Sequence, residues 1–364
     1  MPTGTTAGWK KAKYPLFEPA LNTMFDSYVI KEDGIYKMWF SWRPTKSIMY
    51  TTSTDGIHWE PFCCVLTRQL DSSWEADKVS RPTLVKKDNR YHMWYTGHMI
   101  WSGPLSAAIG YAVSDDGIHW ERPLAHPVLR PDKPWENHII WTPHVIYDEE
   151  EDLFKMWYAG GATEGTESDA LGYATSKDGI HWTKYPLNPI FVPDGSIPWE
   201  MAKVSAPFVW KRDGWYYMSY LGNDADMRGS NGLARSRDGI TNWERHPSNP
   251  IIASSEGCWD HNCICKLMII ETETGYMGWY NGGNRKIEEF GIVNLFPATS
   301  NGAKNVRWKP GRSPSRTRTC MRMKRAQMES RRRMSGKTIP ISAPSISHTD
   351  YLLENQHPSQ TITR

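Results

Sequence analysis

The chain has 364 residues, of which 39% are hydrophobic, and it combines 19 Trp and 17 Tyr with 28 Gly and 25 Pro. This composition suits many short strands and turns better than long helices. Residues 1–14 contain no apolar stretch like that of a signal peptide, and no apolar run approaches the length of a membrane span. We therefore expect a cytoplasmic protein with no membrane partner.

The net charge of +3 conceals two regions of opposite sign. Residues 298–364 hold 14 basic and three acidic side chains, whereas the rest of the chain holds 29 basic and 37 acidic ones. We therefore consider an acidic body, residues 15–295, separately from a basic tail, residues 296–364.

One unit of about sixty residues recurs along the body. A turn signature, Ser-x-Asp-Gly-Ile-His-Trp, spans residues 53–59 and returns at 114–120, at 176–182 and, as a variant, at 236–243. A Trp followed by an acid also recurs, as Trp74-Glu75, Trp135-Glu136, Trp199-Glu200 and Trp259-Asp260. A third signature, an aromatic strand such as Met38-Trp39-Phe40, occurs five times.

The hydrophobic pattern within a unit indicates four strands. Residues 28–30 lead through Asp33-Gly34 into residues 36–40, which is typical of a β-hairpin. A third strand, such as residues 109–113, runs into the Asp-Gly turn, and a short fourth begins at the Trp. Five such units predict an all-β fold, a five-bladed β-propeller of four-stranded antiparallel blades over residues 15–295.

Propeller geometry sorts the repeated features by face. With the strands of a blade labelled A to D from the axis outward, strand A starts on the face that also carries the B–C loop. The Asp-Gly-Ile-His-Trp turns join C to D and lie on the opposite face. We expect these turns to be structural, with Gly at positive φ, Asp bonding turn amides and Trp packing between blades. The acids of the Trp-acid pairs recur in four blades, so we expect them to share an architectural role, such as bonding loop amides.

When the units are aligned, one residue of each unit falls near the start of strand A, at the narrow centre of the propeller. We call this set the axial ring: Asp26, Arg81, Thr142, Ala206 and Lys266. Asp26 is its only acid. Charges at such a centre are costly unless they are paired or used, which favours a functional site. A structural ion pair of Asp26 with Arg81 or Lys266 is the alternative.

Several other side chains are expected on the same face and, with Arg81 and Lys266, are candidates for substrate binding. They are Trp42, Arg43, His98, His144 and Asp224. Aromatic faces stack on sugar rings, and carboxylates and Arg bind hydroxyl groups, so this set indicates a carbohydrate substrate.

Glycoside hydrolysis needs two carboxyl groups, one to protonate the leaving oxygen and one to act as base or nucleophile. We expect Asp26 to stay ionised beside Arg81 and Lys266 and assign it the second role. Candidates for the acid are, in order, Glu288, Asp77 and Glu200.

The body resembles the five-bladed propeller glycoside hydrolases. These include arabinanases, β-xylosidases and invertases. The resemblance rests on the position of Asp26, on the repeated turns and on strands such as residues 36–40. The resemblance implies that Asp26 is the base or nucleophile. It also implies a catalytic Glu two residues before a Pro in a later inner strand, but Ser80, Trp141 and Ser205 occupy the matching positions. A central calcium ion occurs in some of these enzymes, but no ligand set in the sequence demands a metal, and we expect no cofactor.

The repeat stops after Val293, with no fifth Asp-Gly-Ile turn and no closing strand, so the last blade is expected to be incomplete. The tail is dense in Arg, Lys, Ser and Pro, and we expect disorder rather than nucleic-acid binding. The leading hypothesis is a glycoside hydrolase that removes a terminal sugar from an oligosaccharide or glycan. The alternatives are a non-catalytic carbohydrate-binding propeller and a propeller glycosidase impaired by the aberrant C-terminus.

Overall fold

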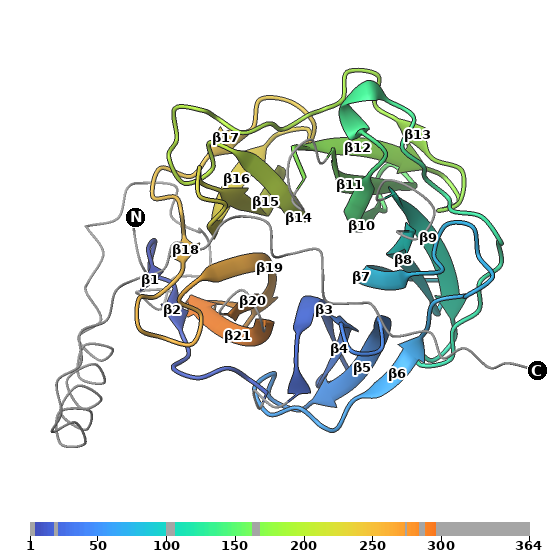
Figure 1. Ribbon diagram of the computed structural model, residues 1–364, viewed down its shortest axis with the longest axis horizontal. Helices are drawn as coiled ribbons and strands as arrows, with labels where there is room; N and C mark the ends of the chain where they lie inside the picture. Colours follow the sequence, from blue (N-terminus) through green and yellow to red (C-terminus); the bar gives the residue numbers. More distant parts are fainter. Residues whose placement is uncertain are drawn as a thin grey trace, which may run out of the picture. The chain divides into compact units, whose positions relative to one another are not determined.

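The computed structural model describes residues 4–17, 21–99, 106–161, 168–273, 275–283 and 288–295. Five antiparallel sheets stand around a common centre, each with its first long strand innermost (Figure 1). The predicted all-β propeller is therefore confirmed, whereas the predicted disordered tail lies outside the described residues. In the described part of the chain, no helix is both long and apolar enough to cross a membrane.

The blades follow the repeat units. Blade 1 consists of β3 (Met24–Glu32), β4 (Ile35–Trp42), β5 (Ser47–Ser53) and β6 (Cys63–Leu66). Blade 2 consists of β7 (Lys78–Lys87), β8 (Arg90–Met99) and β9 (Ser106–Ser114), and blade 3 of β10 (Ile140–Asp148), β11 (Leu153–Gly160), β12 (Ala170–Ser176) and β13 (Thr183–Lys184).

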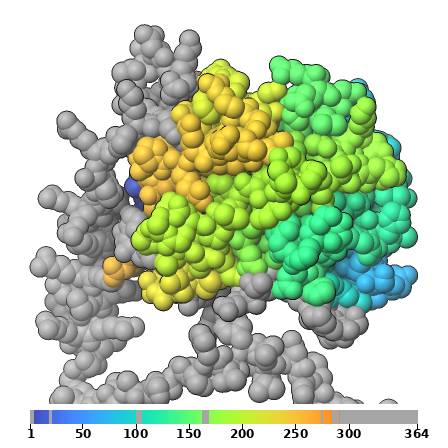
Figure 2. Space-filling model, turned by 90° about the horizontal axis from the view of Figure 1, so that it is seen from above, coloured from blue at the N-terminus to red at the C-terminus, as the bar shows by residue number. Residues whose placement is uncertain are grey.

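Blade 4 is built from β14 (Lys203–Arg212), β15 (Trp215–Asn223), β16 (Gly229–Ser236) and β17 (Glu244–Arg245), extended by β18 (Ile252–Ala253) and β1 (Gly4–Thr5). Blade 5 is built from β19 (Cys263–Thr272), β20 (Gly275–Gly283), β21 (Glu288–Leu295) and β2 (Lys10–Lys11). Seen from the side, the colours of the chain follow one another from blue-green through green to yellow and orange, as expected for blades arranged in chain order (Figure 2).

Tryptophans of the second strands join neighbouring blades. Trp39, Trp94 and Trp157 are fully buried, and each indole Nε1 donates a 2.8 Å hydrogen bond to the turn glycine carbonyl of the next blade. Trp279 of blade 5 donates in the same way to Gly56 of blade 1, at 3.0 Å. In blade 4 Ser219 takes this position and donates instead to the Leu267 carbonyl of blade 5, at 2.6 Å.

The repeated turns lie at the far end of the third strands and are structural, as expected. In the first turn Asp55 Oδ1 accepts hydrogen bonds from the amides of Ile57 and His58, and Oδ2 contacts His58 Nδ1 at 2.7 Å. Gly56 has a φ of 75°, which a residue without Cβ adopts freely. The His58 side chain is 87% exposed on this face.

The recurring acids of the Trp-acid pairs share one arrangement. Each accepts a hydrogen bond from a tyrosine of its own second strand and pairs with a cation at the edge of the blade, at distances of 2.5–3.0 Å. The sets are Glu75 with Tyr95 and Arg122, Glu136 with Tyr158 and Lys184, Glu200 with Tyr220 and Arg245, and Asp260 with Tyr280 and Lys11. The architectural role is thus shared by these tyrosines and cations in all four sets, and loop amides add to it as expected at Glu136, which accepts hydrogen bonds from the amides of Asp132 and Lys133.

The N-terminal segment completes blade 5, which the sequence had led us to expect without a closing strand. Strand β2 pairs antiparallel with β21, so that Lys10 lies opposite Asn294 and Lys11 opposite Val293. Lys11 Nζ lies 2.6 Å from Asp260 Oδ2, inside the blade. The ring is therefore closed by a strand from the opposite end of the chain.

We expect Lys11→Met to lower the free energy of unfolding by about 3 kcal/mol, because it leaves the buried Asp260 carboxylate without its cation. Lys10 is exposed on the same strand, and Lys10→Met should change stability by less than about 0.5 kcal/mol. Urea unfolding of the two variants measures both effects. Equal losses would contradict a closing role for the Lys11–Asp260 pair.

Candidate functional site

A register break interrupts every innermost strand at the same place. The breaks fall between Phe25 and Tyr28, Ser80 and Thr83, Trp141 and His144, Ser205 and Phe208, and Ile264 and Leu267. In four blades the first enclosed residue is the predicted member of the axial ring, and each has positive φ: Asp26 (52°), Arg81 (58°), Thr142 (44°) and Ala206 (48°). In blade 5 that position is held by Cys265, so the predicted alignment was wrong by one residue there, and Lys266 is the second residue of the break. Bulges re-aim side chains, and strained backbone of this kind clusters at functional sites.

The structure brings the charged members of the axial ring together. Arg81 Nε lies 2.9 Å from Asp26 Oδ2, and the Asp26 side chain is 7% exposed. The Arg81 N–H is not aligned for a hydrogen bond, so the contact is an ion pair only. Arg81 also stacks on Trp141, with its guanidinium carbon 4.8 Å from the ring centroid.

Lys266 is the second cation of the axial ring. It is 2% exposed, and its Nζ has no hydrogen-bond partner among the described residues. Burial lowers the pKa of Lys266 to about 8, with Asp26 acting to raise it and Arg81 to lower it further. Burying an ammonium group without a hydrogen-bond partner costs folding free energy. Residues with strongly shifted pKa values of this kind cluster at functional sites.

Three cations surround the buried ring of Phe25, which precedes Asp26. The guanidinium carbons of Arg43 and Arg81 each lie 5.5 Å from the Phe25 centroid, and Lys78 Nζ lies 6.0 Å from it. We call Arg43, Lys78 and Arg81 the Phe25 cations. Lys78 and Phe25 were not predicted as site residues, although each lies in a strand that the ring alignment used.

Both predicted histidines are fully buried and neutral. His98 Nε2 lies 3.0 Å from Ser80 Oγ, and burial together with Lys78 and Arg81 lowers the pKa of His98 well below its usual value. His144 Nε2 donates to the Val209 carbonyl at 2.7 Å, and burial and Lys266 lower the pKa of His144 to about 3. Because the carbonyl only accepts, His144 Nδ1 carries no proton, and it has no hydrogen-bond partner among the described residues.

Two further candidates stand near this centre. Asp77 is buried and pairs with Lys46 at 2.6 Å, and its backbone amide donates to the His98 carbonyl. Glu288 is the first residue of β21, which starts on the same face, but its side chain lies outside the described residues.

The remaining candidates have other surroundings. Glu200 belongs to the buried Trp-acid set and contacts Tyr220 and Arg245, not the axial ring. Trp42 packs on Phe62 and donates to the Leu21 carbonyl within blade 1. Asp224 Oδ1 accepts hydrogen bonds from the amides of Asp226 and Arg228, so this carboxylate caps its own loop.

The positions at which the resemblance implies a catalytic Glu are occupied by hydrogen-bonded neutral side chains. Ser80 contacts His98, and Ser205 Oγ lies 3.2 Å from Ser168 Oγ. The Trp141 indole donates to the same Ser168 hydroxyl. Asp26 is therefore the one carboxylate that the described residues bring into the axial ring.

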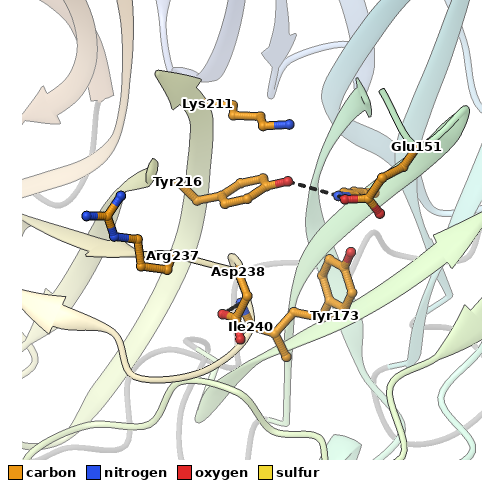
Figure 3. Close-up of a pocket in the computed structure, with 8 residues that line it drawn as sticks. Glu151, Tyr173, Lys211, Tyr216, Arg237, Asp238 and Ile240 are labelled. Atoms are coloured by element: carbon orange, nitrogen blue, oxygen red, sulfur yellow. Dashed lines mark hydrogen bonds and ion pairs between the residues drawn. The ribbon is translucent and has the colours of Figure 1, made fainter. Parts of the chain in front are cut away.

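A pocket of about 390 Å³ lies on the other face, between the turns of blades 3 and 4 (Figure 3). Lys155 forms its wall, paired with Asp148 and Glu151 and donating to Tyr216 at 2.9 Å. Lys37 makes the same kind of contacts in blade 1, with Glu32 and Tyr91. The pocket is thus lined by a network that joins blades, and it does not contain the axial ring.

The described residues do not fit a divalent cation on the axis. Lys266 and Arg81 place positive charge there, and no group of three or more His, Cys, Asp or Glu among the described residues could hold a metal ion. A calcium ion beside them would be repelled.

Comparison with protein families decides the relationship. The model of "Glycosyl hydrolases family 43" matches residues 19–286. The chain belongs to glycosyl hydrolase family 43. The resemblance to the propeller glycoside hydrolases is therefore confirmed, and the assignment supports glycosidase activity.

This family 43 chain is 30% identical over 222 residues to an uncharacterised protein of Mycobacterium tuberculosis, covering 60% of this chain and 71% of the relative. It is 31% identical over 134 residues to a β-1,2-mannobiose phosphorylase of Thermoanaerobacter sp., covering 33% and 43%. The fold is similar to an endo-arabinase from Bacteroides thetaiotaomicron, with a TM-score of 0.60 and 16% identity over 79% of this chain and 98% of that one.

We expect Glu200→Gln to leave kcat/KM unchanged within about twofold, while it lowers stability by about 2 kcal/mol, because the Arg245 guanidinium loses its carboxylate. Steady-state kinetics and urea unfolding of the same preparation separate the two effects. A loss of turnover at full stability would return Glu200 to the list of acids.

Proposed function

We propose that the chain removes a terminal sugar from an oligosaccharide or glycan at the axial ring. In this proposal Asp26 acts on the anomeric centre as base or nucleophile. The observation that carries it is a strained, buried carboxylate at the centre of a propeller, paired with Arg81 and close to Lys266. Enzymes use burial and charge pairing of this kind to set the protonation state of a catalytic carboxylate.

The neighbouring residues have roles that follow from their contacts. Arg81 lies between Asp26 and the Trp141 ring and so fixes the carboxylate against one wall. The proton for the leaving oxygen would come from Asp77 or Glu288, which begin or border strands on the same face. Glu200 is set aside because its carboxylate is enclosed by Tyr220 and Arg245.

A non-catalytic carbohydrate-binding propeller is the second candidate. It is favoured by Ser80, Trp141 and Ser205 at the positions where the related enzymes carry an acid. Both candidates predict a sugar at the axial ring, and they differ only in turnover.

A panel of aryl furanosides and pyranosides, assayed with wild type and Asp26→Asn, separates them. Arabinose, mannose and fructofuranose belong in the panel because relatives are named for these sugars. Hydrolysis that is lost in Asp26→Asn supports the enzyme. Sugar binding without turnover in both proteins leaves the binding protein.

A further inference from the structure

One position of the second strands contacts the axial ring of the next blade. It lies two residues after the blade-joining position, so in Trp39-Phe40-Ser41 of blade 1 it is Ser41. Its occupants in blades 5, 1 and 2 are polar, whereas those in blades 3 and 4 are the apolar Ala159 and Leu221. We call the three polar occupants the ring-holding residues: Asn281, Ser41 and Thr96.

Each ring-holding residue accepts a hydrogen bond from the backbone amide of an axial-ring residue in the next blade. Asn281 Oδ1 accepts from Asp26 at 3.4 Å, Ser41 Oγ from Arg81 at 2.7 Å, and Thr96 Oγ1 from Thr142 at 3.2 Å. All three acceptors are buried, with at most 1% of the residue exposed. The polar members of the ring in blades 1, 2 and 3 are thus each tied to the preceding blade.

The amides that are held belong to strained backbone. Asp26 has a φ of 52° and Arg81 a φ of 58°, which residues with a Cβ adopt only at a cost. Such a conformation persists where the surrounding structure over-determines it. A hydrogen bond to the amide of the strained residue fixes the preceding peptide plane, and so helps to fix the direction in which the side chain leaves the strand.

Ser41 lies where it can set the distance between Asp26 and Arg81. In the ladder of blade 1 it stands opposite Phe25, the residue before Asp26, and its hydroxyl reaches the Arg81 amide in blade 2. The Asp26 carboxylate and the Arg81 guanidinium come from these same two blades and meet at 2.9 Å. A shift of blade 2 against blade 1 would therefore change their contact, and the Ser41 hydroxyl opposes that shift.

We propose that Ser41 is a positioning residue, whose hydroxyl holds Arg81 at the distance from Asp26 that turnover requires. The inference rests on the proposed function, because it gives Ser41 a task in the reaction of Asp26. A misplacement of about 1 Å at a reacting group can cost a hundredfold in rate. A residue that only joined the blades would affect stability and leave turnover unchanged.

Kinetics of Ser41→Ala, Ser41→Val and Ser41→Thr separate these two roles. Val and Thr have nearly the same shape, but only Thr keeps the hydroxyl, as Thr96 does at this position in blade 2. We expect Ser41→Ala and Ser41→Val to lower kcat about tenfold or more, with KM within about twofold of wild type, and Ser41→Thr to keep kcat within about threefold. Equal kcat in Ser41→Val and Ser41→Thr would overturn the inference.

Ser53→Ala is the matched control in the same blade. Ser53 is buried, and its hydroxyl accepts a hydrogen bond from the Gly56 amide at 2.8 Å, in the turn on the opposite face. It loses the same kind of bond far from Asp26, so its stability should fall as that of Ser41→Ala does while kcat and KM stay at the wild-type values. Equal losses of kcat in the two alanine variants would contradict a positioning role.

Crystal structures of Ser41→Ala and Ser53→Ala test the positioning itself and need no turnover. The contact between Arg81 Nε and Asp26 Oδ2, 2.9 Å in wild type, should lengthen beyond about 4 Å in Ser41→Ala alone. An unchanged contact, or a lengthened one with wild-type kcat, would overturn the inference. A lengthened contact in a protein whose wild type cleaves no glycoside would support the positioning by Ser41 and count against the glycosidase alone.

Discussion

We expect Asp26→Asn to lower kcat/KM for the cleaved glycoside by about a thousandfold or more. Asn has nearly the same shape as Asp but can neither accept a proton as a base nor attack an anomeric carbon. The ion pair with Arg81 is lost as well, so we also expect stability to fall by about 1–3 kcal/mol. Activity must therefore be compared at a temperature where both proteins are folded.

Asp88→Asn is the matched control, with the same chemical change at a side chain that is 83% exposed in a turn between β7 and β8. Its φ of 52° is one that Asn tolerates as well as Asp. Kinetics of this variant should match wild type. If Asp26→Asn retained more than about a tenth of the activity, the assignment of Asp26 would be wrong.

Lys266→Met should have the opposite effect on stability, raising the free energy of unfolding by about 2 kcal/mol at neutral pH while activity falls. Lys266 is 2% exposed, and no described residue accepts a hydrogen bond from its ammonium group. Methionine fills a similar volume without a charge to desolvate. The result would show that Lys266 lowers the stability of the wild-type protein and is present for its role in function.

The pH dependence of stability checks the same claim. The pKa of Lys266 is lowered from 10.5 to about 8 in the folded state, so the unfolded chain binds more protons between these values. Wild-type stability should rise with pH across that window relative to Lys266→Met. Lys155→Met is the control, because Lys155 is buried but paired with Asp148 and Glu151, and its loss should destabilise by about 3 kcal/mol. Equal destabilisation by both substitutions would contradict the account.

The blades could be predicted from the sequence because their signatures recur at a fixed spacing, but the closure of the ring could not. Strand β2 has two residues, Lys10 and Lys11, and no hydrophobic alternation that a repeat search could detect. The structure also explains why the second strand of blade 4 has Ser219 where the other blades have Trp. Ser219 replaces the blade-joining Trp before the one blade whose sequence lacks the turn that would accept its hydrogen bond.

Cysteines illustrate a limit of the same kind. The chain has six cysteines, whose spacing along the sequence resembles no disulfide framework, and the exposed Cys63 and Cys64 are free thiols. Cys258, however, is disulfide-bonded. Such a pairing depends on proximity in space, which spacing along the chain does not report.

The candidate site was predictable where the units disagree. Asp26 and Arg81 stood out because each differs from its counterparts in the other blades, and the structure pairs them. Lys266 stood out in an alignment that was one residue out of register in blade 5, although its ammonium group does lie near both. Lys78 did not stand out in the sequence. Its neighbours Phe25 and Arg43 are distant from it along the chain, and only the folded propeller brings them close to Lys78 and Arg81. Glu200 was ranked as an acid by its charge, although its burial against Tyr220 and Arg245 could not be read from one sequence.

The central claim is that the chemistry takes place at the axial ring. A crystal structure of Asp26→Asn soaked with the glycoside that wild type cleaves tests this most directly. The account predicts a sugar whose anomeric carbon lies within about 3.5 Å of the residue 26 side chain. A sugar bound in the pocket of Figure 3, with the axial ring empty, would contradict it.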